Sequence, residues 1–159
     1  MPSIDHQWLV VWAIRKMERD GFRAAAFDGD LPQCDFNSRL PTPFTLSGCR
    51  ADAWGYSDRQ SLIAFVEAKR TVDINRAHTR RQLLILGNAR MRGSSVRCPL
   101  YLAIPRSAAY ELDRVLIDTR LIGARHVIRV HVPDALLEEN QYAARQASTR
   151  LPASSARGN

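Results

Sequence analysis

The most informative stretch of this sequence is Leu62-Ile63-Ala64-Phe65-Val66-Glu67-Ala68-Lys69. Its first residues are apolar in succession, which is typical of a central strand buried on both faces of a sheet. Two charged residues, Glu67 and Lys69, then close the strand. Because side chains alternate along a strand, these two point to one face of the sheet and Ala68 points to the other. The pattern predicts opposite charges side by side at the end of a buried strand.

A second strand, Cys49–Tyr56, precedes this one and carries Asp52 among small and apolar residues. If it pairs with Ser61–Glu67 as a hairpin, Asp52 approaches Glu67 across the ladder. Two carboxylates and an ammonium group are costly to desolvate unless something pairs them. A divalent metal held by Asp52 and Glu67, with Lys69 beside the attacking water, would pair them.

The remaining pattern predicts a single α/β (α+β) domain at residues 1–145, with helices flanking a mixed central sheet in the order α-β-β-β-α-β-α-β. The loop Asp28–Gly48 has no sustained period, and we expect Gln146–Asn159 to be a disordered tail. We expect a first helix at His6–Asp20 capped by Asp5, further strands at Phe22–Phe27, Pro99–Ile104 and Val127–Val132, and helices at Asn75–Arg92, from Ser107 to about Leu121, and at Ala135–Ala144.

The charge is unevenly distributed. The chain of 159 residues has a net charge of +7, and the segment from Lys69 to Arg97 alone holds eight basic side chains against one acid, Asp73. Such a segment suits a polyanion, although a solvated helix surface kept soluble by like charges is the alternative. The residues that we expect to contact nucleic acid are Arg70, Arg76, His78, Arg80, Arg81, Arg90 and Arg92.

Several protein classes are disfavoured by what the sequence lacks. Three cysteines, Cys34, Cys49 and Cys98, argue against a disulfide framework or a cysteine-based zinc site, and favour a reducing, cytoplasmic location. No apolar run approaches the roughly 20 residues that span a bilayer, so no membrane partner is expected. Neither a glycine-rich phosphate loop nor a serine nucleophile elbow is present.

The order of elements, with Asp52 on the second strand and Glu67-Ala68-Lys69 on the third, resembles the PD-(D/E)XK nucleases. The resemblance covers roughly Asp5 to Ile104 and departs at Ala51, where many members have proline. It implies a restriction-endonuclease-like core and a Mg²⁺-dependent nuclease, with Mn²⁺ as a substitute ion. Asp52 and Glu67 would be the metal ligands, and Lys69 would orient the attacking water.

The same resemblance implies further site residues. Some members carry a glutamine or basic residue on the next helix, near the scissile phosphate, and Gln82 is the candidate here. Others have an acidic ligand in the first helix, for which Asp5 and Glu18 both stay open. DNA is the expected substrate, with RNA not excluded, and a homodimer is an open alternative because one site cuts one strand.

Two other classes of protein remain alternatives to the nuclease. The first is a catalytically inactive, nuclease-like module that binds nucleic acid or serves assembly. The second is a protein-interaction domain whose charge serves only solubility.

Overall fold

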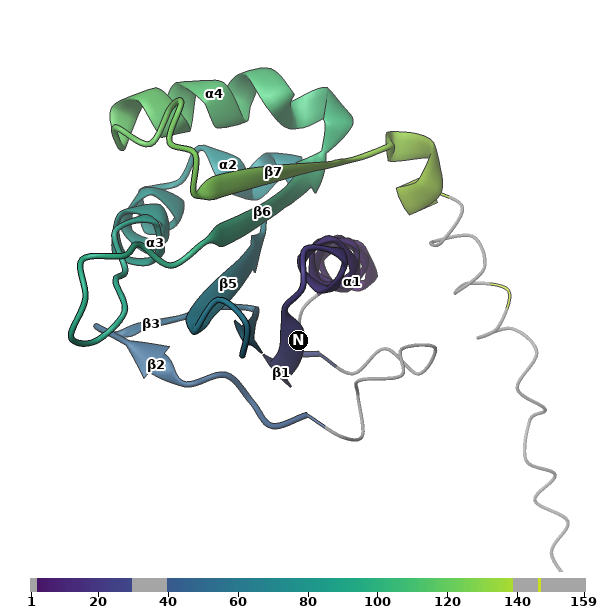
Figure 1. The fold of residues 1–159 in the computed structure, drawn as a ribbon. Coiled ribbons are helices and arrows are strands. Elements are labelled where there is room, and N and C mark those ends of the chain that lie inside the picture. Colours follow the sequence, from purple (N-terminus) through teal and green to yellow (C-terminus); the bar gives the residue numbers. More distant parts are fainter. Residues whose placement is uncertain (1–2, 30–39, 139–145, 147–159) are drawn as a thin grey trace, which may run out of the picture.

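A five-stranded mixed sheet forms the centre of the residues that the computed structural model describes, which are 3–29, 40–138 and 146 (Figure 1). Its strand order is β1-β4-β5-β6-β7, in which β4 pairs antiparallel with both β1 and β5, while β5, β6 and β7 run parallel. The predicted mixed sheet flanked by helices is therefore confirmed. The strand bounds are Arg23–Phe27 for β1, Ala53–Ser57 for β4, Leu62–Ala68 for β5, Leu100–Pro105 for β6 and Val127–Val132 for β7.

Helices cover both faces of this sheet (Figure 1). Helix α1 (Ile4–Arg19) lies across one face, mainly against β5 and β6. Helices α3 (Ala77–Gly87) and α4 (Ala109–Asp118) cover the other face. Two short elements complete the connections between the parallel strands, namely α2 (Thr71–Ile74) before α3 and the 3₁₀ turn η1 (Arg106–Ala108) before α4.

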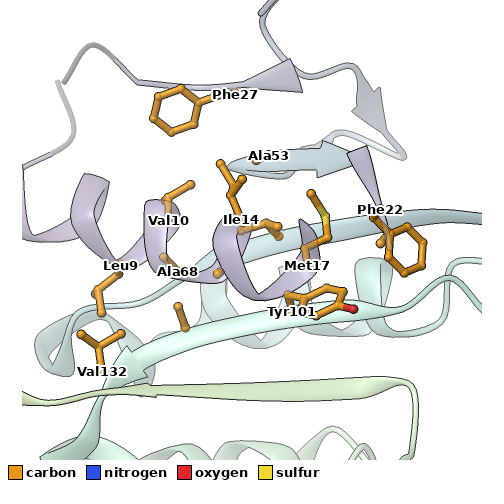
Figure 2. Packing of buried hydrophobic residues seen from close by; sticks show 14 of the residues in the cluster. Leu9, Val10, Ile14, Met17, Phe22, Phe27, Ala53, Ala68, Tyr101 and Val132 are labelled. Carbon is orange, nitrogen blue, oxygen red and sulfur yellow. The ribbon is translucent and has the colours of Figure 1, made fainter. Parts of the chain in front are cut away.

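The core on the α1 face combines large helix side chains with small strand side chains (Figure 2). The helix contributes an i, i+4, i+5 stripe of fully buried apolar residues, which includes Leu9, Ile14 and Met17. The sheet contributes small side chains directly beneath them, among them Ala53 and Ala68. Small residues on the strands allow α1 to pack close to the sheet.

The core on the other face is built from larger strand residues. Phe65 of β5, with Leu100 and Leu102 of β6, packs there against Leu83 of α3 and Leu116 of α4. Because side chains alternate, β5 places Ala64, Val66 and Ala68 under α1 and Phe65 towards α3. The continuous apolar character predicted for β5 is thus explained by burial on both faces.

The first helix begins at Ile4, earlier than predicted, and Ser3 rather than Asp5 caps it. The Oγ of Ser3 accepts a hydrogen bond from the backbone N–H of His6 at 3.3 Å. Asp5 lies instead in the first turn, where a negative charge interacts favourably with the helix dipole. The prediction of Asp5 as the cap was therefore wrong by two positions.

The single strand predicted at Cys49–Tyr56 is broken. Its first part, β3 (Cys49–Arg50), pairs with β2 (Thr45–Leu46) in a separate two-stranded sheet, and Asp52 lies between β3 and β4. The loop predicted at 28–48 therefore contains a strand, and its residues 30–39 lie outside the described residues. The break matters because it frees Asp52 from the ladder.

The helix predicted at Asn75–Arg92 is also shorter than expected. It ends at Gly87, just before the C-cap residue Asn88, and a β-carbon at Gly87 would lie 2.5 Å from Cδ1 of Leu121. Arg90 and Arg92 consequently lie in the loop between α3 and β6, and do not share a helix with Arg81. The basic helix of the prediction is in fact a helix followed by a basic loop.

The C-terminal part differs in two details. Ser107 belongs to η1 instead of capping α4, and its Oγ and N–H donate to the two carboxylate oxygens of Asp134 at 2.5 and 3.0 Å. Residues 134–138 are helical, as predicted, and the rest of the predicted last helix lies outside the described residues. Of the predicted tail, only Gln146 is described.

The close approach of α1 to the sheet makes a first prediction. A β-carbon at Gly55 of β4 would lie 2.6 Å from Cε of Met17 and 2.7 Å from the carbonyl oxygen of Arg23. We expect Gly55→Ala to lower the free energy of unfolding by about 1–3 kcal/mol, because backbone and helix must both shift. Chemical denaturation measures this loss.

The control for that prediction is Gly123→Ala. Gly123 has a φ of 73° and open space around its α-carbon, so its substitution costs only the backbone strain of about 1 kcal/mol. A loss at Gly55 no larger than the loss at Gly123 would contradict the close packing of α1.

Candidate functional site

The side chain of Asp52 replaces a backbone hydrogen-bond partner at the end of the β4–β5 ladder. Its own N–H donates to the carbonyl oxygen of Val66 at 3.0 Å, and the ladder between β4 and β5 ends one residue later in β4, at Ala53. The N–H of Ala68 is then satisfied by Oδ2 of Asp52 at 2.8 Å. The carboxylate is therefore fixed at the end of β5 by a hydrogen bond that depends on the break before β4.

Glu67 and Lys69 meet at this same end of β5, on the face that α3 covers. The Nζ of Lys69 lies 2.6 Å from Oε1 of Glu67 and donates to Oε1 of Gln82 at 2.5 Å. Gln82 comes from α3 and is 8% exposed, as is Lys69. The backbone of Lys69 is held in turn by its N–H, which donates to the carbonyl oxygen of Ala103 at 2.9 Å.

The carboxyl group of Glu67 is the group of the site whose negative charge is most disfavoured by its surroundings. It is 1% exposed, and within the described residues its Oε2 has no hydrogen-bond partner. Burial, followed by the charge of Asp52, raises the pKa of Glu67 to about 8, and the nearby Lys69 only partly opposes this. A second cation placed between the two carboxylates would relieve both effects.

His6 is a member of the site that sequence analysis missed. Its Nε2 lies 3.2 Å from Oδ2 of Asp52, on the side of the carboxylate that α1 approaches. Burial disfavours protonation of His6, but the hydrogen-bonded Asp52 outweighs it and the pKa of His6 is raised. A signal was present, because His6 precedes Leu9 and Val10 by three and four residues and so lies on the buried stripe of the helix.

Cys49 borders the same cluster. Its thiol is buried, hydrogen-bonds with Gln82, and has its pKa raised by burial and by the charge of Glu67. Cys49 and Cys98 are both free and buried, and Cys34 lies outside the described residues. A protonated thiol at this position serves packing and supports the amide of Gln82.

The two acidic candidates of the first helix lie at opposite ends of it. Glu18 is exposed near the opposite end of α1 from His6. Asp5 lines a surface pocket of about 250 Å³ together with Arg70 and Thr71. His6, one position after Asp5, is the residue of α1 that contacts Asp52 directly.

The basic residues divide into two groups. Arg70 and Arg76 both form ion pairs with Asp73, at 2.8 and 3.2 Å, and Arg80 forms one with Asp118 at 2.8 Å. The other basic candidates have no ion pair within the described residues, namely His78, Arg81, Arg90 and Arg92. Fewer of the predicted basic side chains are therefore free to bind an external anion than the sequence indicates.

Comparisons of this chain with models of protein families, with curated proteins and with solved structures gave no match. None of the helices in the described part of the chain has the length and apolar character needed to cross a membrane. The same residues contain no group of three or more His, Cys, Asp or Glu side chains placed to hold a metal ion. A metal ion at this site would therefore depend on the two carboxylates, a set that suits Mg²⁺ because this ion keeps several water ligands.

The raised pKa of Glu67 predicts how stability depends on pH. The folded protein keeps this proton to about pH 8, whereas an ordinary carboxyl loses it near 4.5, so folding becomes less favourable as pH rises between these values. We expect the Tm of the metal-free protein to fall by several degrees across this window. Calorimetry of wild type and Glu67→Gln isolates the effect, because glutamine cannot ionise.

Mg²⁺ provides the second half of that test. If Mg²⁺ binds at this site it requires the ionised carboxylate, so it should raise the Tm of the wild type more at about pH 8 than at about pH 6, and should not stabilise Glu67→Gln. Parallel pH curves for the two proteins would contradict the buried, protonated state of Glu67.

Proposed function

We propose that this chain is a Mg²⁺-dependent nuclease with a restriction-endonuclease-like core, and that it hydrolyses phosphodiester bonds in DNA. The observation that carries the proposal is the buried Glu67 carboxyl, which lies beside Asp52 and Lys69 with one oxygen unpaired in the described residues. Such a group destabilises the fold, and groups of this kind are found mainly where they serve a function. We take that function to be the binding of a cation during catalysis.

The donor set fits a hard divalent cation. Asp52 and Glu67 offer carboxylate oxygens, and the backbone carbonyl of Ala68, the residue after Glu67, would add a third oxygen of the same character. Mg²⁺ bound here would lower the pKa of a water ligand and neutralise charge that develops on the phosphate. His6 holds Asp52 from the other side, so the carboxylate keeps one orientation.

Lys69 supports the attack on phosphorus. Its ammonium group is already ordered by Glu67 and Gln82, so it can orient a water molecule and stabilise the developing negative charge without further loss of side-chain freedom. Gln82 acts through Lys69 and is a positioning residue. Arginine side chains beside the site would hold the phosphate backbone without reading the sequence of bases.

Nuclease activity is tested with isosteric changes. We expect Glu67→Gln and Lys69→Met to lower cleavage in Mg²⁺ by at least about 100-fold, because each removes charge from the reacting centre. Glu67→Gln should fold well, since glutamine resembles the protonated carboxyl that the fold favours. Plasmid, linear duplex, branched DNA and RNA are the substrates, and EDTA should abolish cleavage.

The matched controls are Glu18→Gln and Lys16→Met, which make the same chemical changes on α1, at an exposed position and at a half-buried position that pairs with Asp20. Both should retain wild-type rates. Cleavage that survives the changes at Glu67 and Lys69 would rule out this site as its source.

The role of Gln82 makes a separate prediction. Gln82→Ala removes the acceptor that orders Lys69, so we expect kcat to fall about tenfold with little change in KM. Single-turnover rates over a range of pH measure the effect. Asn88→Ala, which removes an exposed amide just after the same helix, should change neither constant.

One observation favours the alternative of a nuclease-like module that binds nucleic acid without cleaving it. In the described residues the carboxylates are not joined by a third ligand side chain, and Lys69 already partners Glu67. Calorimetry that detects no Mg²⁺ binding, together with salt-dependent DNA binding and no hydrolysis, would favour this alternative.

A further inference from the structure

The loop between α3 and β6 forms a narrow hairpin at residues 89–98, which we name the arginine hairpin. Cys98 N–H donates to the carbonyl oxygen of Ala89 at 2.9 Å, and Met91 N–H donates to that of Val96 at 3.0 Å. The turn passes through Gly93, whose φ of 77° suits glycine. In Figure 1 this hairpin projects from the body of the molecule between α3 and β6.

The arginine hairpin is attached firmly to the core. Met91 packs against the apolar cluster beneath α3 and α4, and its Sδ accepts a hydrogen bond from the N–H of Ile63 at 3.3 Å. Cys98 is buried at the other end of the hairpin. The backbone is thus ordered before any ligand arrives, which lowers the entropic cost of binding.

The charges on this hairpin have no counter-ion in the described residues. Arg90 and Arg97 face each other across an antiparallel bridge, a placement of like charges that is unfavourable by itself. Arg92 is exposed at the turn, and the guanidinium of Arg90 donates to the carbonyl oxygen of Ser95. The sequence has no Asp or Glu at all between Asp73 and Glu111.

We propose that the arginine hairpin is an anchoring site for the phosphodiester backbone of nucleic acid, separate from the site of cleavage. The proposal rests on the proposed function for the identity of the ligand. Phosphate oxygens between Arg90 and Arg97 replace the missing counter-ions, and the planar guanidinium groups suit them. The arginines that already pair with Asp73 and Asp118 contribute little to this contact.

The position of the arginine hairpin determines how far the anchored phosphates lie from the site of cleavage. It touches β5 at Ile63, whereas Asp52 binds the N–H of Ala68, five residues further along the strand. Five residues of strand span about 16 Å. For a duplex that runs along β5, this span corresponds to about five steps of 3.4 Å each between the anchored phosphates and the cleaved bond.

The test measures DNA binding by fluorescence anisotropy in EDTA, where no cleavage occurs. We expect Arg90→Gln/Arg97→Gln to reduce the slope of log affinity against log salt by about 1.8, which is two lost phosphate contacts. If the curves meet near 1 M salt, the affinity at about 0.1 M falls by about 60-fold. Arg90→Lys/Arg97→Lys keeps both charges and should keep most of the slope.

The control is Arg15→Gln/Arg19→Gln, which removes the same charge from exposed positions on α1, on the other face of the sheet. It should leave the slope nearly unchanged. An equal decrease in both double variants would show that only net charge matters and would overturn the proposal, as would a wild type that binds no DNA at any salt concentration.

A ladder of duplex lengths tests the reach. Shortening the duplex by about five base pairs should weaken binding of the wild type and leave the hairpin variant unaffected, since its anchor is already lost. Cleavage in Mg²⁺ is scored separately. Hairpin-dependent binding without cleavage would end the nuclease proposal alone, and cleavage without hairpin-dependent binding would end the anchoring proposal alone.

Discussion

A carboxyl group buried at the end of the central strand is the constraint on which the rest of the site depends. Glu67 is almost fully enclosed, so water cannot solvate its charge, and Lys69 is the cation in direct contact with its carboxyl group. Gln82 of α3 then fixes Lys69, while His6 of α1 lies against Asp52. Helices from both faces of the sheet therefore converge on one short stretch of β5.

The central features of this arrangement could be predicted from sequence because they follow local rules. Alternation along a strand places Glu67 and Lys69 together, and an apolar run indicates that β5 is central. The break at Asp52 could not be predicted, because its flanking residues fit a continuous strand. Only the pairing of β3 with β2, a contact between segments of a loop, makes the break visible.

The errors at the helices have a similar origin. Helix α3 ends at Gly87-Asn88, before the expected Arg92, and Gly87 lies there against Leu121, a contact with a distant segment that follows α4. His6 is difficult to predict for another reason, because a polar residue in the first turn of an amphipathic helix has no pattern of its own. A polar residue at the end of the buried stripe of such a helix lies beside the sheet, where it can meet a charged strand end.

The small residues beneath α1 affect the candidate site through the position of the helix. Because Ala53, Gly55 and Ala68 leave no spare space under the helix, the height of α1 above the sheet is determined in the core. The first turn of that helix carries His6. One methyl group added beneath α1 would therefore change how the imidazole of His6 meets the carboxylate of Asp52. Core side chains beneath α1 therefore help to determine how His6 meets Asp52.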